Sequence, residues 1–454
     1  IIRENNTSME NLYKLDGKVP ILKAILFGLK HILAMFVANL SPITLIGLAS
    51  SLKQTEIAFL LQNAMFIAGI VTLIQLYPIW KIGSRLPIVM SVSFNFVAIL
   101  TYVGATYGYA SAMGAVLIGG LIEGCLGLLA RYWKKIITPI VAASVITSID
   151  FSLFSVGTRS FGGGYSESFG SAKNLLLGII TLAACLLFNI FAKSYSQQLS
   201  VLFCLIVGNI LAIFMGKVDL SVIFNGGLIA LSHLLPFKMK FDLGAIIAVV
   251  VIFLVSATET IGDTSALVNS GLNREVTEEE ISDSLACDGF CSSISSLFGC
   301  PPITSFSQNV SLINITKVVN RFTIATGAIC MILVGLLPPI GNFFSSLPES
   351  VLGGGTIMMF GTILTSGIEM IAKAGFNQRN VTIVALSLAV GIGFTSGTEA
   401  DIWHIFPQII QDVFAGNCVA VVFVVSIILS LVLPKDMNLS LIHISEPTRQ
   451  EAIS

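Results

Sequence analysis

The chain has 454 residues, of which 55% are hydrophobic and only 11% charged, and its mean hydropathy is +0.91. An ordinary soluble domain carries roughly 25% charged residues, so this composition excludes a soluble enzyme, a nucleic-acid-binding protein and a disordered protein. The 24 basic and 25 acidic residues nearly cancel, so net charge indicates no polyanionic partner. The composition predicts an all-α polytopic membrane protein, because a chain that crosses hydrocarbon must satisfy its backbone hydrogen bonds internally.

Apolar windows separated by charges, prolines or glycines follow one another along the chain. A spanning helix needs about 20 apolar residues, and most of the windows approach that length. The first seven are 21–48, 57–77, 87–103, 110–129, 136–156, 175–191 and 199–215. The second seven are 243–268, 281–298, 302–315, 322–344, 351–372, 381–394 and 416–433. We therefore expect 14 transmembrane segments in two halves of seven.

The distribution of Lys and Arg predicts the orientation of these segments. If the N-terminus is inside, 16 of the 24 Lys and Arg residues fall at inner ends and loops, and 6 fall in outer loops. Positive residues accumulate on the cytoplasmic side of membrane proteins. We therefore expect a multi-pass protein of the cell membrane, with residues 1–20 and the C-terminus cytoplasmic. Residues 441–449 resemble a translated sequencing-adapter read, so the tail 439–454 is expected to be non-native.

The third window of each half is unusually short and polar. Residues 86–95 and 301–309 both open at proline, pass through β-branched and Ser/Thr residues, and reach a Phe and an Asn. Seven spans place the second half upside down in the membrane, and interrupted segments at matching positions of inverted halves indicate a transporter binding site. The alternative is that both are loops beside helices broken by proline. The first interpretation predicts short extended breaks in segments 3 and 10.

Two acidic residues lie within the first window of the second half. Glu259 and Asp263 are four residues apart, so they share one helix face. Carboxylates at membrane depth are costly and usually mark an ion or proton pathway. Because like charges repel and burial disfavours ionisation, one of the two is expected to hold a proton readily near neutral pH. The alternative is a pair bonded to backbone for packing alone.

Amide side chains follow the second break, where a helix is expected to begin. Gln308 and Asn309 each offer a hydrogen-bond donor and an acceptor, and a helix N-terminus adds free N–H groups. Such a site suits a planar heterocycle with N–H and C=O edges. Glu259 is placed to accept from two ring N–H groups, and Phe94 at the first break offers an aromatic face for stacking.

Three further polar residues fall within apolar windows. Asp288 is expected either to orient the second break or to contact the ligand. His31 in the first window is expected to bond to Ser93 or Asn95 at the first break, with direct proton transfer as the alternative. Glu123, between glycines, is interpreted as a helix–helix contact, with a coupling role as the alternative.

The eight cysteines are interpreted as buried apolar residues rather than as disulfides. Cys287, Cys291 and Cys300 form the only cluster, and no His or second Cys pair lies at ligand spacing. We therefore expect no metal site. No cofactor is expected either, since no strand–loop–helix pattern supports a nucleotide-binding motif.

These residues together resemble the nucleobase–ascorbate transporter family, and most closely its bacterial xanthine and uric acid permeases. Residues 308–316 read QNVSLINIT against the family pattern Gln/Glu-Asn-x-Gly-x-x-x-x-Thr, so Ser311 replaces the family glycine. Residues 259–263, ETIGD, match the family's helix motif in full, and Asp288 with its following glycine matches the next one. The family Gln-His of the first span stands here as Lys30-His31, so only His31 carries over.

The resemblance implies two inverted seven-helix repeats arranged as a core and a gate domain. The core would comprise 21–134 and 243–346, and the gate 135–242 and 347–434. The gate is usually the contact of a homodimer. Substrate-binding residues would be Glu259, Gln308 and Phe94, with Ser93 and Asn309 beside them. Asp263, Asp288, His31 and Asn309 would shape the site or the proton coupling.

The resemblance also implies the substrate. Uracil-specific relatives usually carry Glu in place of Gln308 and His in place of Asp263, so the residues present favour purines. Ser93 is small where some xanthine-selective relatives carry Asn, which leaves room for uric acid. We expect proton-coupled uptake of xanthine or uric acid by an elevator movement of core against gate, with H⁺ favoured over Na⁺. The alternatives are a uracil or broad nucleobase permease, an anion exchanger of the same fold, a channel and a membrane hydrolase.

Overall fold

The computed structural model describes residues 10–434 except 134–137, 219–220, 222 and 224–226. The predicted non-native tail at 439–454 and residues 1–9 at the N-terminal end therefore lie outside the described residues. The helices of the first half are α2 (Ile21–Ala49), α3 (Gln54–Leu76), α4 (Val97–Tyr107), α5 (Tyr109–Leu128), α6 (Ala130–Trp133), α7 (Pro139–Phe161), α8 (Ala172–Phe191) and α9 (Ser200–Phe214). Those of the second half are α10 (Leu243–Gly271), α11 (Glu278–Leu297), α12 (Ser307–Thr316), α13 (Arg321–Gly335), α14 (Pro338–Ser345), α15 (Glu349–Ala374), α16 (Gln378–Gly393), α17 (Gln408–Phe414) and α18 (Cys418–Val432). The described residues also include the short 3₁₀ helices η1 (Phe94–Phe96), η3 (Ser194–Leu199) and η5 (Gly397–Ile405).

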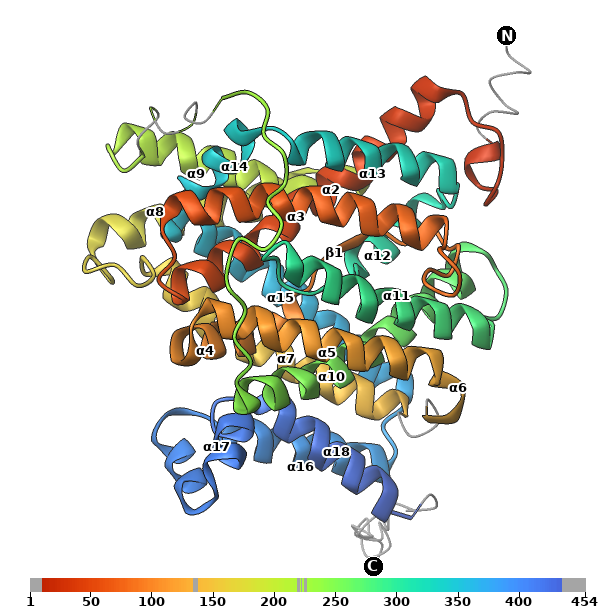
Figure 1. Ribbon diagram of the computed structural model, residues 1–454, viewed down its shortest axis with the longest axis vertical. Helices are drawn as coiled ribbons and strands as arrows, with labels where there is room; N and C mark the ends of the chain where they lie inside the picture. Colours follow the sequence, from red (N-terminus) through yellow and green to blue (C-terminus); the bar gives the residue numbers. More distant parts are fainter. Residues whose placement is uncertain (1–9, 134–137, 219–220, 222, 224–226, 435–454) are drawn as a thin grey trace, which may run out of the picture.

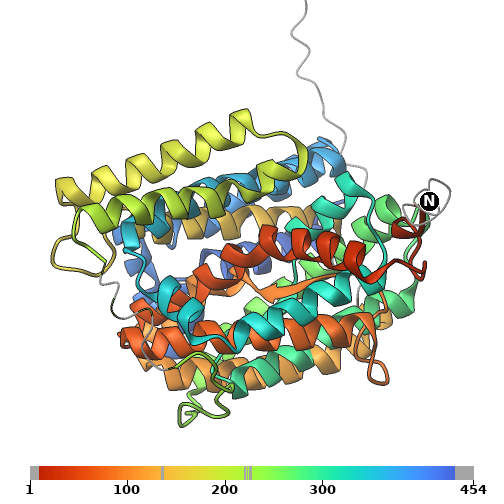
Figure 2. The same cartoon turned by 90° about the horizontal axis from the view of Figure 1, so that it is seen from above.

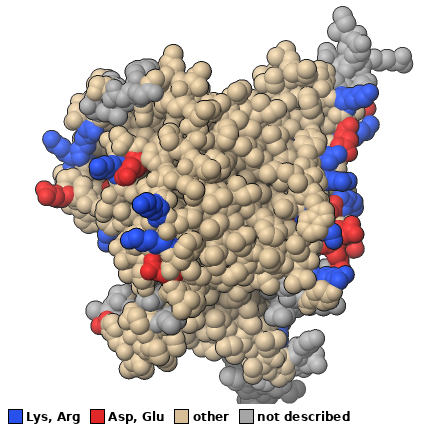
Figure 3. All heavy atoms as spheres, viewed as in Figure 1, with Lys and Arg blue, Asp and Glu red and all other residues tan. Residues whose placement is uncertain are grey.

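Several of these helices are able to cross a membrane. Six described helices are long and apolar enough to span it, namely α3, α5, α7, α8, α10 and α15. Helices α13 and α14 together make a further candidate, and they are bent by 78° at the break between them. The sequence window 322–344 is therefore not one straight helix, because Pro338 lacks the N–H that would continue it. Figure 3 shows charged side chains gathered toward the left and right edges, with a wide uncharged band between them. The chain is a multi-pass membrane protein.

Each of the two predicted breaks contains a short strand, and the strands pair with each other. Strand β1 (Met90–Val92) lies antiparallel to β2 (Ile303–Ser305), in the register Met90↔Ser305, Ser91↔Thr304 and Val92↔Ile303. All six residues are buried. Prolines before each strand disfavour the continuation of a helix through it, and β-branched residues favour extended backbone. β1 lies near the centre of the molecule in Figure 1, where it packs against α2 and α3, while β2 packs against α11.

Side chains from the surrounding helices satisfy the outer edges of this two-stranded sheet. The Val92 N–H donates to Asn39 Oδ1 of α2 at 2.9 Å, and the Met90 N–H donates to Thr72 Oγ1 of α3 at 3.0 Å. On the other strand, the Ile303 N–H donates to Ser292 Oγ of α11 at 3.1 Å. A buried backbone group without a partner would cost free energy comparable to a lost hydrogen bond. These side chains therefore make an open sheet tolerable at membrane depth.

Asn39→Ala is expected to lower the thermal unfolding midpoint of the detergent-solubilised protein. The substitution leaves the buried Val92 N–H without its acceptor and removes the acceptor of Ser91 Oγ, which lies 3.2 Å from Asn39 Oδ1. An unsatisfied buried group costs about 1–3 kcal/mol. A midpoint equal to that of the wild type would contradict this account of the sheet.

The helices pack in groups drawn from both halves of the chain. α2 and α3 pack with α13, and α5 packs with α10 and α11. α7 packs with α15, α16 and α18, and α15 also contacts α8 and α9. Figure 2 shows α8 and α9, in yellow to yellow-green, side by side as an outer pair. Helices from the two halves of the chain therefore pack against each other.

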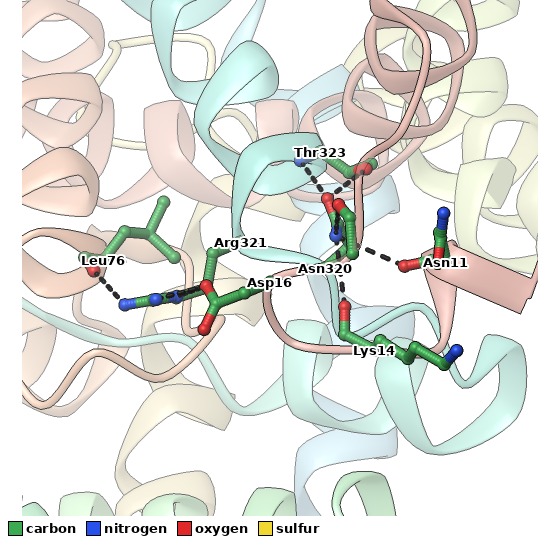
Figure 4. Close-up of polar contacts among 8 residues, drawn as sticks. Asn11, Lys14, Asp16, Leu76, Asn320, Arg321 and Thr323 are labelled. Atoms are coloured by element: carbon green, nitrogen blue, oxygen red, sulfur yellow. Dashed lines mark hydrogen bonds and ion pairs between the residues drawn. The ribbon is translucent and has the colours of Figure 1, made fainter. Parts of the chain in front are cut away.

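Hydrogen bonds and an ion pair hold the segment before α2 against the start of α13 (Figure 4). Asn320 Nδ2 donates to the backbone carbonyls of Asn11, Lys14 and Gly17 at 3.3, 3.1 and 2.8 Å. The neighbouring Arg321 forms an ion pair with Asp16. This segment therefore belongs to the folded unit rather than forming a separate arm.

Candidate functional site

A cavity of about 590 Å³ lies between the second break and α15. Its inner wall comes from α10 and from the segment around the start of α12, and the opposite wall comes mainly from α15. On the inner wall the lining residues are Glu259, Gly262, Asp263, Ala266, Phe306, Ser307, Gln308 and Val310. On α15 they are Met358, Met359, Thr362, Ile363, Glu369, Met370 and Lys373. The remaining lining residues are Leu33, Ile146, Asn189, Gln197, Ser200, Val201 and Leu202.

Three of the predicted site residues share this inner wall. Glu259 and Asp263 lie one turn apart on α10, and Gln308 lies in the first turn of α12. Gly262 leaves open space toward the cavity, since the first atom that a Cβ there would meet is the Met370 methyl at 4.0 Å. A ligand is therefore able to approach the α10 backbone between the two acids.

The two breaks meet at these acids. Glu259 accepts a hydrogen bond from Asn95 Nδ2 of the first break and one from Ser307 Oγ of the second, the latter at 2.8 Å. Asp263 Oδ2 lies 3.0 Å from Ser305 Oγ and 2.9 Å from Ser307 Oγ. Hydrogen bonds from side chains in both breaks therefore fix the position of the acids. Sequence reasoning missed Ser305 and Ser307, although hydroxyls in a predicted break were the available signal.

Asp288 lies behind the cavity rather than on its wall. It is buried on α11 and accepts from Thr260 Oγ1 of α10 and from the Ser305 N–H, the latter at 3.4 Å. Of the two roles open for it from the sequence, these contacts favour orientation of the second break. Glu123 of α5 is also buried, and neither of its carboxyl oxygens has a hydrogen-bond partner among the described residues.

His31 is hydrogen-bonded to the second break, so the prediction that it bonds to Ser93 or Asn95 on the first break is wrong. Its Nδ1 lies 2.8 Å from Asn309 Nδ2, not beside Ser93 or Asn95. Asn309 Oδ1 in turn accepts from the Val89 N–H at 3.3 Å. The pairing of β1 with β2 explains the difference, because it brings the start of α12 against α2. His31 and Asn309 are both 2% exposed and do not line the cavity.

Phe94 and Ser93 lie on the first break, and neither lines the cavity. The Phe94 ring packs edge-on against Phe360 of α15, with centroids 5.7 Å apart and planes at 78°. Phe306, the aromatic residue of the second break, does line the cavity. Sequence reasoning gave Phe306 no role. The side chain of Ser311, which replaces the family glycine, lies outside the described residues.

Comparisons with known proteins agree with this architecture. The transmembrane domain of a cyanobacterium bicarbonate transporter, BicA, aligns with a TM-score of 0.58 at 16% identity, over 91% of this chain and 99% of that one. Xanthine permease XanQ of Escherichia coli K12 is 30% identical over 95% of both chains. Uric acid permease PucK of Bacillus subtilis is 32% identical over 83% of this chain and 88% of its own length. The family model described as "Permease family" (Xan_ur_permease) matches residues 22–400. The chain therefore belongs to this permease family and is a transporter, not an enzyme.

Proposed function

We propose that the chain is a proton-coupled purine permease that takes up xanthine, uric acid or both. The observation that carries the proposal is a cavity among membrane helices with a carboxyl group, Glu259, and an amide, Gln308, on one wall. Two relatives, a xanthine permease and a uric acid permease, support the same substrate class.

The chemistry of the cavity suits a planar base. Its volume of about 590 Å³ falls in the usual range for small-ligand sites, roughly 300–1,000 Å³. Glu259 accepts from ring N–H groups, while Gln308 supplies a donor and an acceptor to the base edge. Phe306 on the inner wall and Met358 and Met359 on α15 offer apolar surface, and thioethers make favourable contacts with aromatic rings.

The residues behind this wall complete the proposed site. Phe94 and Ser93 on the first break face the base when the Phe94–Phe360 contact opens. Asn309 and His31 hold the start of α12 in place through their mutual contact at 2.8 Å. Asp288 holds the second break by its bond from the Ser305 N–H.

The packing of the helices supports a division into a core and a gate. In this proposal 21–134 and 243–346 form the core that carries the site, and 135–242 and 347–434 form the gate, which includes α15. The chain then has 14 spans in two inverted halves, cytoplasmic termini and a homodimer contact through the gate. Protonation near Glu259 lowers the cost of burying it, and the loaded core slides past the gate. A charge that crosses the membrane gains about 2.3 kcal/mol per 100 mV.

Uptake of radiolabelled xanthine, uric acid, guanine and uracil in transport-deficient cells tests the proposal. We expect saturable uptake of xanthine or uric acid that is faster at lower external pH, because the proton is a co-substrate, and that an uncoupler suppresses. Uptake of uracil alone would favour the uracil permease instead. Chloride- or sulfate-dependent current without purine uptake would favour an anion exchanger, and uptake that follows Na⁺ rather than pH would contradict proton coupling.

A further inference from the structure

One hydroxyl group lies between the two acids of α10. Ser307 Oγ is 2.8 Å from Glu259 Oε1 and 2.9 Å from Asp263 Oδ2. A serine hydroxyl carries a single hydrogen, so Ser307 donates to only one of these carboxyl groups. The other contact is a hydrogen bond only if the carboxyl group supplies the proton. In a buried site, two oxygens this close without a proton between them would repel strongly.

The same arrangement continues from Asp263 to the next helix. Ser305 Oγ lies 3.0 Å from Asp263 Oδ2 and 3.4 Å from Thr260 Oγ1, and Thr260 Oγ1 donates to Asp288 Oδ2. Thr260 and Asp288 are each 1% exposed, and Ser305 is 7% exposed. A continuous row of oxygens therefore runs from the cavity wall at Glu259 to the buried Asp288.

The number of hydrogens in this row limits its charge. The row contains five oxygen–oxygen contacts but only three hydroxyl hydrogens. It is fully hydrogen-bonded only when two protons reside on its carboxyl groups. With fewer protons at least one contact loses its hydrogen, and the hydroxyl at that point must turn toward its other neighbour. The protonation state of one acid is therefore linked to the protonation states of the others.

We propose that a hydroxyl relay, formed by Ser307, Ser305 and Thr260, lets the buried acids of α10 and α11 share the coupling proton. In the first step Glu259 gives its proton to Ser307 Oγ, while Ser307 gives its own hydrogen to Asp263, so the hydroxyl ends with one hydrogen. Glu259 is then free to accept from the base, and the proton is retained on Asp263, from which Ser305 and Thr260 connect to the buried Asp288. The inference rests on the proposed function and names the residues that link binding to protonation.

Other titratable groups surround the relay. From α5, Glu123 lies within electrostatic reach of Asp288. From α2, His31 contacts the start of α12 through Asn309. From α15, Glu369 and Lys373 line the cavity and pair with each other at 2.8 Å. None of these groups is hydrogen-bonded to the relay in the part of the chain that the structure describes.

Ser307→Ala tests the relay, with Ser307→Thr as the variant that keeps the hydroxyl. We expect Ser307→Ala to lower purine uptake by about tenfold, the size of one hydrogen bond to a charged group, and to flatten its dependence on external pH. Ser307→Thr is expected to restore the pH profile. Thr304→Val is the matched control, because Thr304 is buried on the same strand as Ser305, but among the described residues its hydroxyl is hydrogen-bonded only to the Ser305 carbonyl, at 3.5 Å. That control should keep the wild-type profile.

An infrared pH titration of the purified protein measures the coupling between the buried carboxyl groups and does not require transport. In the wild type, the C=O band of the protonated carboxyl groups is expected to titrate in separated steps, because acids that share a proton release their protons at macroscopic pKa values that belong to the whole group. Ser307→Ala should weaken the coupling and bring these steps closer together. Thr260→Val, which lies outside the cavity lining, should uncouple Asp288 from the other acids, and it provides the same test if Ser307→Ala fails to reach the membrane.

The outcomes separate the relay from the proposed function. If the wild type shows proton-coupled purine uptake while Ser307→Ala and Thr260→Val keep its pH profile and its separated infrared steps, the relay is wrong and the function stands. If the wild type transports no purine but the infrared steps move together in both variants, the shared proton stands and the purine assignment fails.

Discussion

Glu259→Gln is expected to reduce purine uptake by roughly 30- to 5,000-fold, since loss of one partner from a buried charged hydrogen bond costs about 2–5 kcal/mol. The substitution keeps the shape of the side chain but removes the proton-binding group. It also replaces one acceptor oxygen with an NH₂ group. This donor then faces either the N–H groups of the base or the Ser307 and Asn95 donors, and in both cases a hydrogen bond is lost. The measurement is the initial rate of radiolabelled xanthine and uric acid uptake at matched protein levels in the membrane.

Glu279→Gln is the matched control, because the same chemical change is made at an exposed position at the start of α11. An exposed carboxylate there contributes at most about 1 kcal/mol through charge pairing, so uptake should stay close to that of the wild type. Wild-type uptake by Glu259→Gln would defeat the site assignment. Equal losses in both variants would indicate a general effect of lost acidity rather than a role for the cavity wall.

The sequence predicted where the two helices are interrupted by extended segments, but it did not predict that these two segments pair with each other. Prolines at the two matching positions and the polar residues after them indicated extended breaks, and strands lie there. Their register, Met90 opposite Ser305, joins segments more than 200 residues apart. Periodicity carries no information over that separation, because it reports only which face of one element is buried.

The same limit applies to the site. Glu259 and Asp263 were identifiable because a charge within an apolar run is costly, and both line the cavity. The partner of His31 was not identifiable, since Asn309 lies 278 residues away in the chain and only the strand pairing brings it near. The methionines of α15 were missed for a different reason. An apolar side chain in an apolar helix looks the same in the sequence whether it faces lipid, a neighbouring helix or a ligand.

Close contact between α5 and α11 holds Asp288 in position behind the cavity. A Cβ atom built on Gly289 would lie 2.1 Å from the backbone nitrogen of Gly124 and 2.7 Å from the Glu123 carbonyl carbon. On the facing helix, a Cβ on Gly120 would lie 2.6 Å from the Gly289 carbonyl oxygen. Small residues allow membrane helices to approach closely and gain van der Waals contact. Because the nearest atoms at Gly289 belong to the backbone, no side-chain rotation relieves the clash.

Gly289→Ala is therefore expected to push α11 away from α5 and to destabilise the protein by about 1–3 kcal/mol or more. Asp288 precedes Gly289, so the same shift should weaken its contacts with Thr260 and the Ser305 N–H. We expect a lower unfolding midpoint in detergent together with reduced purine uptake per folded molecule. Gly361→Ala on α15 is the control, because no atom outside its own helix turn lies within 4 Å of a Cβ there. It should show wild-type uptake and an unfolding midpoint no lower than that of the wild type, because alanine is the better helix former. A Gly289→Ala protein with wild-type stability would show that the two helices have room to separate, and the position of Asp288 would then require another explanation.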